Sequence, residues 1–177
     1  EDTDIFCFQE VFDTSTDIEI VDEYYRANLF DELSKALQNH IGYFAPVQDG
    51  YGFNGPVNFQ ISWGLAMFIK KSIDTKEVGE IFIKGHKNSK GVDNTTISRN
   101  LQYSIISNKG KQYNINHFHG LWNGQGKTDT EERIEQSNKV KDFLRDKGRI
   151  ILCGDFNLLP NTESLKILEE NLMNLIK

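Results

Sequence analysis

The stretch Ile150-Ile151-Leu152-Cys153-Gly154-Asp155-Phe156-Asn157 is the most informative part of the sequence. Its first four residues form a continuous apolar run, which is typical of a strand covered on both faces. Gly154 lets the backbone turn or approach a ligand closely, and Asp155 and Asn157 point the same way if the extended geometry persists. Because open sheets bind ligands beyond such strand ends, we expect a polar site here.

Length and composition indicate one globular domain, spanning residues 1–177. The chain has 177 residues and is 38% hydrophobic, which suits a sizeable core. No apolar stretch approaches the roughly 20 residues that span a bilayer, and no signal-peptide pattern opens the sequence. We therefore expect a soluble, cytoplasmic protein. The first residue is Glu1 rather than Met, so a preceding secretion signal stays open.

The two cysteines, Cys7 and Cys153, both lie in apolar runs. A free thiol in such a run behaves as a small hydrophobe. We therefore expect neither a disulfide framework nor a cysteine metal site.

The net charge of −6 is unevenly distributed. Residues 1–23 carry acidic side chains without Lys or Arg, whereas residues 70–111 are rich in Lys. The basic segment can attract phosphates, or its lysines can guard exposed sheet edges. The overall acidity argues against tight nonspecific binding to nucleic acid. It does not exclude a nuclease that uses a metal ion.

Strands and helices are mixed along the chain, without a repeat or a convincing linker. We expect strands at residues 5–8, 43–47, 64–69, 80–83, 101–107, 112–118 and 150–153. The turn Asn108-Lys109-Gly110-Lys111 predicts a hairpin between two of them. Amphipathic spacing predicts a helix at 29–37, a second from a cap at Thr128 or Asp129 to about residue 147, and a last one capped by Asn161 or Thr162. The last helix is expected to be buried through Leu165, Leu168 and Leu172.

Glu10 follows Phe6 and Phe8 in the alternation of the first strand. We therefore expect its side chain at the sheet rim, on the face that those aromatic residues bury. Mg²⁺ needs only one or two carboxylates and keeps several waters, so a rim glutamate is a candidate ligand. The alternative is a solvated strand terminus.

His117 and His119 end the second strand of the hairpin and share a face if the alternation holds. An imidazole there can hydrogen-bond a phosphoryl oxygen or a leaving group, or the His-x-His pair can bind zinc. Arg99, before the hairpin, can bind a phosphate through its forked donors or be an ordinary surface arginine.

Taken in order, these residues resemble the endonuclease/exonuclease/phosphatase family, which shares the deoxyribonuclease-I-like fold. The resemblance covers nearly the whole chain and rests mainly on five segments. They are Cys7-Phe8-Gln9-Glu10-Val11, Gly64-Leu65-Ala66-Met67-Phe68-Ile69, Asn116-His117-Phe118-His119-Gly120-Leu121, Asp129-Thr130 with Arg133 and Gln136, and Gly154-Asp155-Phe156-Asn157.

The resemblance implies a four-layer α-β-β-α sandwich and metal-dependent cleavage of a phosphoester. On this basis Glu10, with Asp155, binds Mg²⁺ or Mn²⁺, and Asp155 also orients and deprotonates the attacking water. Asn157 hydrogen-bonds the phosphate, while His119 stabilises developing charge or assists the leaving group. Apart from the resemblance, Arg99 is kept as a candidate substrate-binding residue. Positioning and charge neutralisation contribute most to phosphoryl transfer.

Three departures from the family pattern are visible. His117 stands at the asparagine position of an Asn-x-His motif, only Glu1-Asp2-Thr3-Asp4 precedes the first motif strand, and no histidine follows His119. The family's terminal strands, with an asparagine in the first and an Asp-His pair in the last, are therefore not matched. We expect little turnover from residues 1–177 alone, with self-association or pairing with a missing complementary segment.

Three functions remain open from the sequence. The first is a phosphodiesterase, endonuclease or phosphatase, the second a noncatalytic or split binding module with the same fold, and the third a His-x-His zinc hydrolase. The substrate is a phosphoester, with nucleic acid among the candidates. The expected specificity loops, residues 49–55 and 84–98, show no base-stacking pattern.

Overall fold

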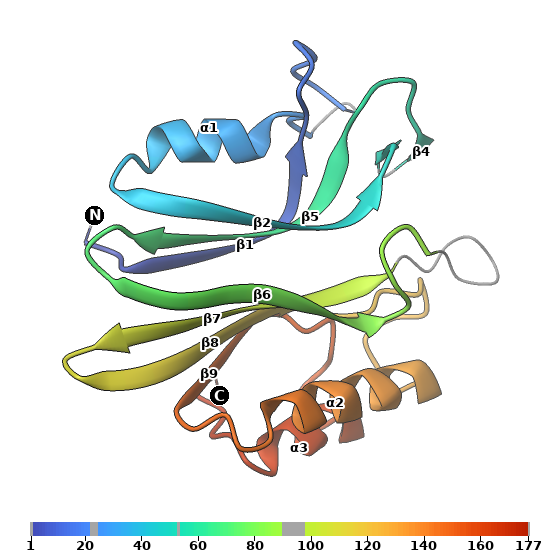
Figure 1. Ribbon diagram of the computed structural model, residues 1–177. Helices are drawn as coiled ribbons and strands as arrows, with labels where there is room; N and C mark the ends of the chain where they lie inside the picture. Colours follow the sequence, from blue (N-terminus) through green and yellow to red (C-terminus); the bar gives the residue numbers. More distant parts are fainter. Residues whose placement is uncertain (1, 22–24, 53, 90–97, 177) are drawn as a thin grey trace.

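The computed structural model describes residues 2–21, 25–52, 54–89 and 98–176. These residues form an α/β sandwich of four layers: helix α1, a three-stranded sheet, a four-stranded sheet, and helices α2 and α3 (Figure 1). This arrangement confirms the expected fold class. Within the described ranges, no helix combines the length and apolar character that crossing a membrane requires.

The three-stranded sheet consists of β1 (Ile5–Asp13), β5 (Ser62–Lys70) and β2 (His40–Asp49), all antiparallel with β5 in the centre. Helix α1 (Leu29–Ala36) covers its outer face. Aromatic side chains fill the space between helix and sheet; they are Phe6, Phe8, Phe30, Phe44 and Phe68. Because β5 is covered on both faces, Trp63 to Ile69 are all buried, as the apolar run in the sequence indicates.

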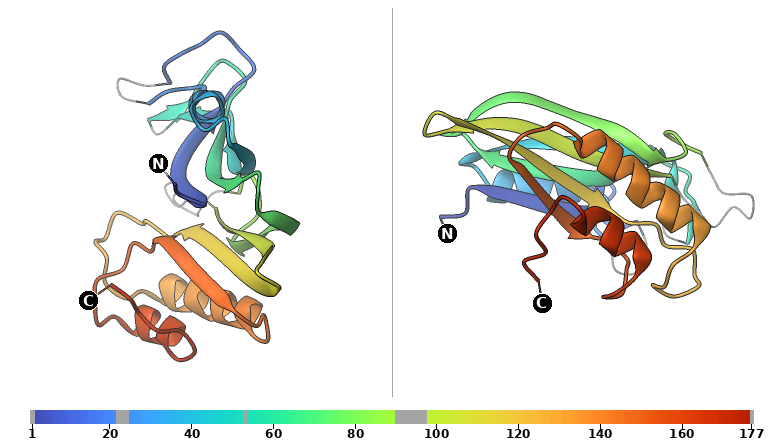
Figure 2. Two further views of the ribbon diagram at one scale, coloured as in Figure 1. Left: turned by 90° about the vertical axis from the view of Figure 1, so that its left-hand side faces the viewer. Right: turned by 90° about the horizontal axis from the view of Figure 1, so that it is seen from below.

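The four-stranded sheet has the order β6 (Asp74–Lys84), β7 (Arg99–Asn108), β8 (Lys111–His119) and β9 (Ile150–Asp155). The predicted hairpin is confirmed, because β7 and β8 pair antiparallel up to Asn108 and Lys111. Strand β9 is parallel to β8 and follows the crossover helix α2 (Glu131–Leu144). Helix α3 (Glu163–Glu169) lies beside α2 on the outer face of this sheet (Figure 2).

The two loops that were expected to set specificity are only partly described. Within residues 49–55, β3 (Tyr51–Gly52) pairs with β4 (Gly55–Pro56), which makes a short ribbon where a loop was expected. Phe53 lies outside the described residues. Residues 90–97 of the 84–98 loop also lie outside them.

The cap of α2 differs from the sequence prediction, whereas Thr162 is the N-cap residue of α3, as predicted. Thr130, rather than Thr128 or Asp129, caps α2, and its hydroxyl accepts from the Arg133 backbone N–H at 3.4 Å. Asp129 instead accepts from the backbone N–H groups of Glu163 and Ser164, at the start of α3. A carboxylate reaching from another segment thus satisfies the free donors of a helix start, which sequence spacing cannot reveal.

The parallel pairing of β8 with β9 positions the candidate site. His119 lies in register with Asp155, at the carboxyl ends of both strands. Since parallel strands end at the same sheet edge, the two candidate motifs meet there. Strand β1 approaches this edge from the other sheet.

Candidate active site

Glu10 lies at an irregularity in strand β1. The pairing register with β5 shifts between Phe8 and Val11, and Glu10 has a φ of 57°. A β-bulge of this kind redirects a side chain. The Glu10 carboxylate consequently lies within electrostatic range of Arg99 and Asp155. Its expected position on the face of Phe6 and Phe8 is therefore wrong, because strict alternation ends at the bulge.

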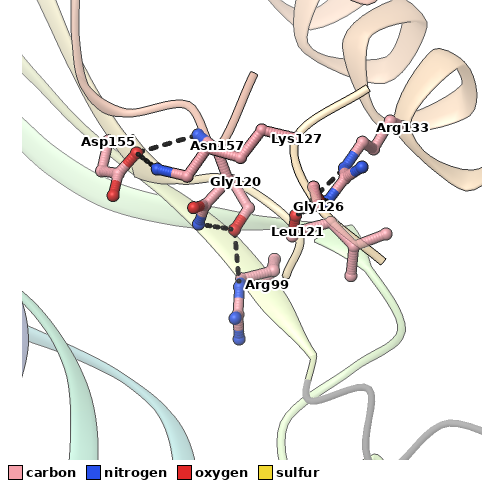
Figure 3. Close-up of polar contacts among 8 residues, drawn as sticks. All are labelled: Arg99, Gly120, Leu121, Gly126, Lys127, Arg133, Asp155 and Asn157. Atoms are coloured by element: carbon pink, nitrogen blue, oxygen red, sulfur yellow. Dashed lines mark hydrogen bonds and ion pairs between the residues drawn. The ribbon is translucent and has the colours of Figure 1, made fainter. Parts of the chain in front are cut away.

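Asp155 ends β9 immediately after Gly154. Gly154 has a φ of 136°, and a Cβ there would lie 1.9 Å from the Phe118 carbonyl oxygen, so this position requires glycine. The Asp155 side chain is about half exposed, with a fraction of 48%. Its Oδ1 accepts from the Asn157 backbone N–H at 2.9 Å and lies 3.7 Å from Lys127 Nζ (Figure 3). The carboxylate is therefore oriented and remains accessible.

The side chains of Asn157 and Arg99 donate hydrogen bonds to the same backbone carbonyl oxygen. Asn157 Nδ2 donates to the Gly120 oxygen at 3.0 Å, and Arg99 Nε donates to it at 3.1 Å (Figure 3). Gly120 must lack a side chain, since a Cβ there would lie 1.9 Å from the Phe156 oxygen. The contact locks the loop after β8 to the corner after β9.

Arg99 is buried, with an exposed fraction of 5%, so the alternative of a surface arginine is wrong. Its Nη1 donates to the Ser98 oxygen at 3.2 Å, and the guanidinium lies over the Trp63 ring at 5.5 Å. Burial lowers the pKa of Arg99 to about 10, against the opposing influence of Glu10. The side chain therefore remains a cation at neutral pH, facing the candidate site.

His117 and His119 are neighbours, as the alternation predicts, and both are buried. Burial lowers the pKa of each to about 4, so both rings are neutral at pH 7. His117 Nε2 accepts from Gln9 Nε2 at 2.7 Å, which leaves the ring proton on Nδ1. Within the described residues, neither Nδ1 atom has a hydrogen-bond partner. His119 can thus act as a neutral hydrogen-bonding group.

Lys127 is a site residue that sequence reasoning missed. Its ammonium group faces Asp155 and adds to the positive potential at His119. The Lys127 carbonyl accepts from the Leu159 backbone N–H at 2.9 Å, which ties its loop to the segment after β9. No local pattern marks this lysine, because its position depends on the folding of the loop.

Arg133 holds that loop in place. Its guanidinium is buried and donates to the carbonyl oxygens of Leu121 and Gly126 (Figure 3). It also donates to the Thr128 oxygen and to Asn123 Oδ1. Gln136, one turn further along α2, accepts from the Leu121 backbone N–H at 3.0 Å. The Arg133 and Gln136 pattern noted in the sequence therefore has an architectural role.

The predicted site residues therefore come together. Glu10 and His119 each interact electrostatically with both Arg99 and Asp155, and the Asn157 backbone N–H bonds to Asp155. A small cavity lies at this junction of the two sheets. Its lining residues are Val47, Trp63, Gly64, Leu65, Arg99, Asn100 and His119. The individual roles of the site residues stay predictions.

The donor atoms fit a hard divalent cation. Burial and the Asp155 charge both raise the pKa of Glu10, while Arg99 opposes them. Two carboxylates that repel each other in a partly desolvated site favour a bound cation. Mg²⁺ and Mn²⁺ prefer such oxygen donors and retain waters, so two carboxylates are sufficient. The site thus suits either ion.

The His-x-His zinc alternative gains no comparable support. Among the residues that the structure describes, no group of three His, Cys, Asp or Glu side chains is placed to hold a metal. His117 Nε2 is also engaged by Gln9. Zinc sites usually need three or four protein ligands.

Comparisons with solved structures show a common fold. The human Nocturnin catalytic domain with bound sulfate has 20% identity and a TM-score of 0.62, covering 95% of this chain and 56% of its own. D. rerio TDP2 complexed with single-strand DNA product has 14% identity and a TM-score of 0.57, covering 94% and 52%. The mannosyl-6-phosphatase Bt3783 of Bacteroides thetaiotaomicron has 19% identity and a TM-score of 0.55, covering 79% and 51%.

The chain spans about half the length of these solved structures. No curated protein matches it. The sequence model of the Endonuclease/Exonuclease/phosphatase family matches residues 1–173, which is nearly the whole chain. The chain therefore belongs to the endonuclease/exonuclease/phosphatase family.

Proposed function

We propose that this chain hydrolyses phosphoesters with a divalent metal ion held by Glu10 and Asp155. The observation that carries this function is the meeting of two carboxylates from different sheets beside a buried arginine. Two carboxylates that repel each other in a partly buried site are unfavourable without a bound cation. The arginine supplies a fixed positive charge for the anionic substrate.

A bound Mg²⁺ or Mn²⁺ supplies Lewis-acid stabilisation of the phosphoryl oxygens. The protein residues provide orientation. Asp155 is held by the Asn157 backbone N–H and Lys127, so its carboxylate is fixed to orient a water molecule and accept its proton. That proton transfer requires the carboxylate form of Asp155.

Arg99 and Lys127 provide positive charge on two sides of the carboxylates. Arg99 is buried and preorganised, which makes it suited to stabilising charge that develops on the phosphoryl group. Lys127 is more exposed, with a side-chain fraction of 42%, and is suited to attracting the substrate. His119 is neutral and acts by hydrogen bonding rather than as a charged acid.

Asn157 has a different proposed role from the one expected. Its amide Nδ2 is committed to the Gly120 oxygen, and the residue is 5% exposed. We assign it to positioning: its side chain fixes the loop after β8, and its backbone N–H fixes Asp155. The second N–H of this amide is not used in the Gly120 bond, so the expected contact with a phosphate stays compatible with the positioning role.

The substrate class follows from the charges and from related folds. One structural relative is described as a mannosyl-6-phosphatase and another was solved with single-strand DNA product. A substrate panel for this chain therefore needs phosphomonoesters and phosphodiesters. The noncatalytic or split-module alternative is kept, because the chain spans about half of those relatives.

The test combines turnover with metal binding. We expect Mn²⁺- or Mg²⁺-dependent hydrolysis of p-nitrophenyl phosphate, bis-p-nitrophenyl phosphate or a single-stranded oligonucleotide. Asp155→Asn should lower the rate about 10²- to 10⁴-fold. Asp142→Asn is the matched control, since this carboxylate is exposed on α2 and pairs only with neighbouring Arg145.

Calorimetry separates the alternatives. One outcome is that the chain binds Mn²⁺, that Glu10→Gln weakens this binding, and that no substrate is turned over. This outcome would support the noncatalytic or split module. Turnover that is independent of divalent metal, or unchanged in Asp155→Asn, would contradict the proposed mechanism.

A further inference from the structure

We propose that Cys7 and Cys153 form a redox pair that closes a disulfide bond between the two sheets. The two residues are far apart in the sequence and lie on β1 and β9. Both are free cysteines in the structure. The two thiols nevertheless perturb each other's pKa across the interface between the sheets, and Cys153 Sγ donates to the Asn116 oxygen at 3.5 Å.

The neighbouring contacts fix this arrangement. Cys7 precedes Gln9 by two residues on β1, so both side chains point to the same face. Cys153 lies in register with His117 through the parallel pairing of β9 and β8. Gln9 and His117 are joined by a hydrogen bond of 2.7 Å across the sheets. The thiol pair and this polar pair are therefore adjacent contacts between the same layers.

The strands that carry the two cysteines approach each other more closely than packed sheets usually do. Face-to-face sheets usually lie about 10 Å apart, too far for most disulfides. Strands β1 and β9, however, contain residue pairs with Cα atoms within 8 Å. Disulfides require Cα separations of about 4.4 to 6.8 Å, so closing the bond requires β1 and β9 to approach to that distance at the two cysteines.

The chemistry needs an oxidant, for which a peroxide is sufficient. One thiol, as its thiolate, attacks the peroxide oxygen and becomes a sulfenic acid, releasing hydroxide that takes up a proton as water. The second thiol then attacks the sulfenic sulfur, forming the S–S bond and releasing a second water. Both cysteines are half-buried, so a small oxidant can reach them. They are the only cysteines in the chain, which leaves no competing intramolecular partner.

The bond would join the two strands that carry the site carboxylates. Cys7 stands three residues before Glu10, and Cys153 two residues before Asp155. A covalent link here would hold β1 against β9 and close a long loop of the chain. Such loop closure stabilises a fold mainly by restricting the unfolded chain.

Oxidation of the purified chain with a small excess of hydrogen peroxide tests the pairing. We expect a monomer that has lost 2 Da, that no longer reacts with maleimide after denaturation, and that yields a crosslinked peptide containing both cysteines. Its melting midpoint should rise by about 5 to 10 °C, and dithiothreitol should reverse both changes.

Cys7→Ser and Cys153→Ser should each leave one alkylatable thiol and abolish the shift in melting midpoint under peroxide. If either variant fails to fold, the mass and the peptide map of the oxidised wild-type chain still show whether the disulfide forms. Interchain dimers, sulfinic acid at either residue, or two free thiols after treatment would each overturn the pairing. None of these measurements depends on catalytic activity, so failure of the proposed function leaves this test intact.

Discussion

Arg133 and Arg99 are both buried, yet their surroundings differ. Arg133, on α2, donates to three carbonyl oxygens and one side-chain oxygen in the loop of residues 121–130. Arg99 at the sheet rim donates to two carbonyl oxygens and otherwise faces an aromatic ring and the Glu10 charge.

The difference separates architecture from function. A guanidinium whose donors are bonded to backbone oxygens stabilises one loop conformation and has little left for a ligand. A guanidinium that makes fewer backbone hydrogen bonds and faces the Glu10 charge and a neutral histidine can respond to an anion. Burial alone therefore does not identify a site arginine, whereas the bonding of its donors does.

The largest effect is expected for Arg133→Ala. This change leaves the oxygens of Leu121, Gly126 and Thr128 without their donor in a buried loop. We expect a loss of about 3 to 5 kcal/mol in the free energy of unfolding, measured by urea denaturation. Arg145→Ala, which removes an exposed arginine, should cost less than about 0.5 kcal/mol. Equal losses would contradict the architectural role.

The pH dependence of the free energy of unfolding should come mainly from the two buried histidines, His117 and His119. His117 and His119 have pKa values of about 4 in the fold against an ordinary 6.5. Between these pH values the unfolded chain binds protons that the folded chain excludes, so stability falls as pH decreases. We expect the two histidines to lose about 5 kcal/mol together from pH 6.5 to 4, with the raised pKa of Glu10 giving a partial offset.

Denaturation at a series of pH values checks this, and His117→Asn is the informative variant. It removes one titrating ring while keeping a polar side chain that can bond to Gln9. The slope of stability against pH should fall by about half. An unchanged slope would show that the buried histidines are not its source.

Changing each arginine to lysine should affect activity and stability differently at the two positions. Arg99→Lys keeps the charge but loses the fork and the stacking over Trp63, and we expect kcat/KM to fall about 10²-fold with a modest change in Tm. Arg133→Lys should lower Tm more strongly and leave kcat/KM of the folded fraction nearly unchanged. The same pattern in both variants would remove the distinction between the two regions.

The smallest effect is expected for Glu10→Gln. Loss of one oxygen ligand should weaken Mn²⁺ binding by about tenfold, as measured by calorimetry. Tm should rise slightly in the absence of metal, because burial and Asp155 disfavour the Glu10 charge. Glu19→Gln, at an exposed side chain, is the control for both readouts. A fall in Tm with unchanged Mn²⁺ affinity would argue that Glu10 is structural.

Local patterns predicted much of the fold because they depend on short-range chemistry. The apolar run before Gly154, the turn at residues 108–111 and the amphipathic spacing of α1 each placed an element correctly. The family motifs, carried by the same segments, also indicated which side chains meet at the rim. The boundaries were less accurate: β1 extends to Asp13, well beyond the expected end.

Features that join distant segments were not predictable. The bulge at Glu10 arises from pairing with β5, and Asp129 accepts hydrogen bonds from the start of α3. Lys127 reaches Asp155 because Arg133 holds its loop. From the sequence, the two cysteines were expected to be separate hydrophobic residues. The packing of the two sheets brings their side chains close together.

The sequence by itself determined the strands, the helices and the chemical types available to the site, since these follow from residue spacing and side-chain identity. Only the tertiary structure decided which face Glu10 occupies, that Arg99 is buried and that Asn157 is bonded to Gly120. These outcomes depend on strand register and on competition among buried donors and acceptors. Both are settled by contacts between segments distant along the chain.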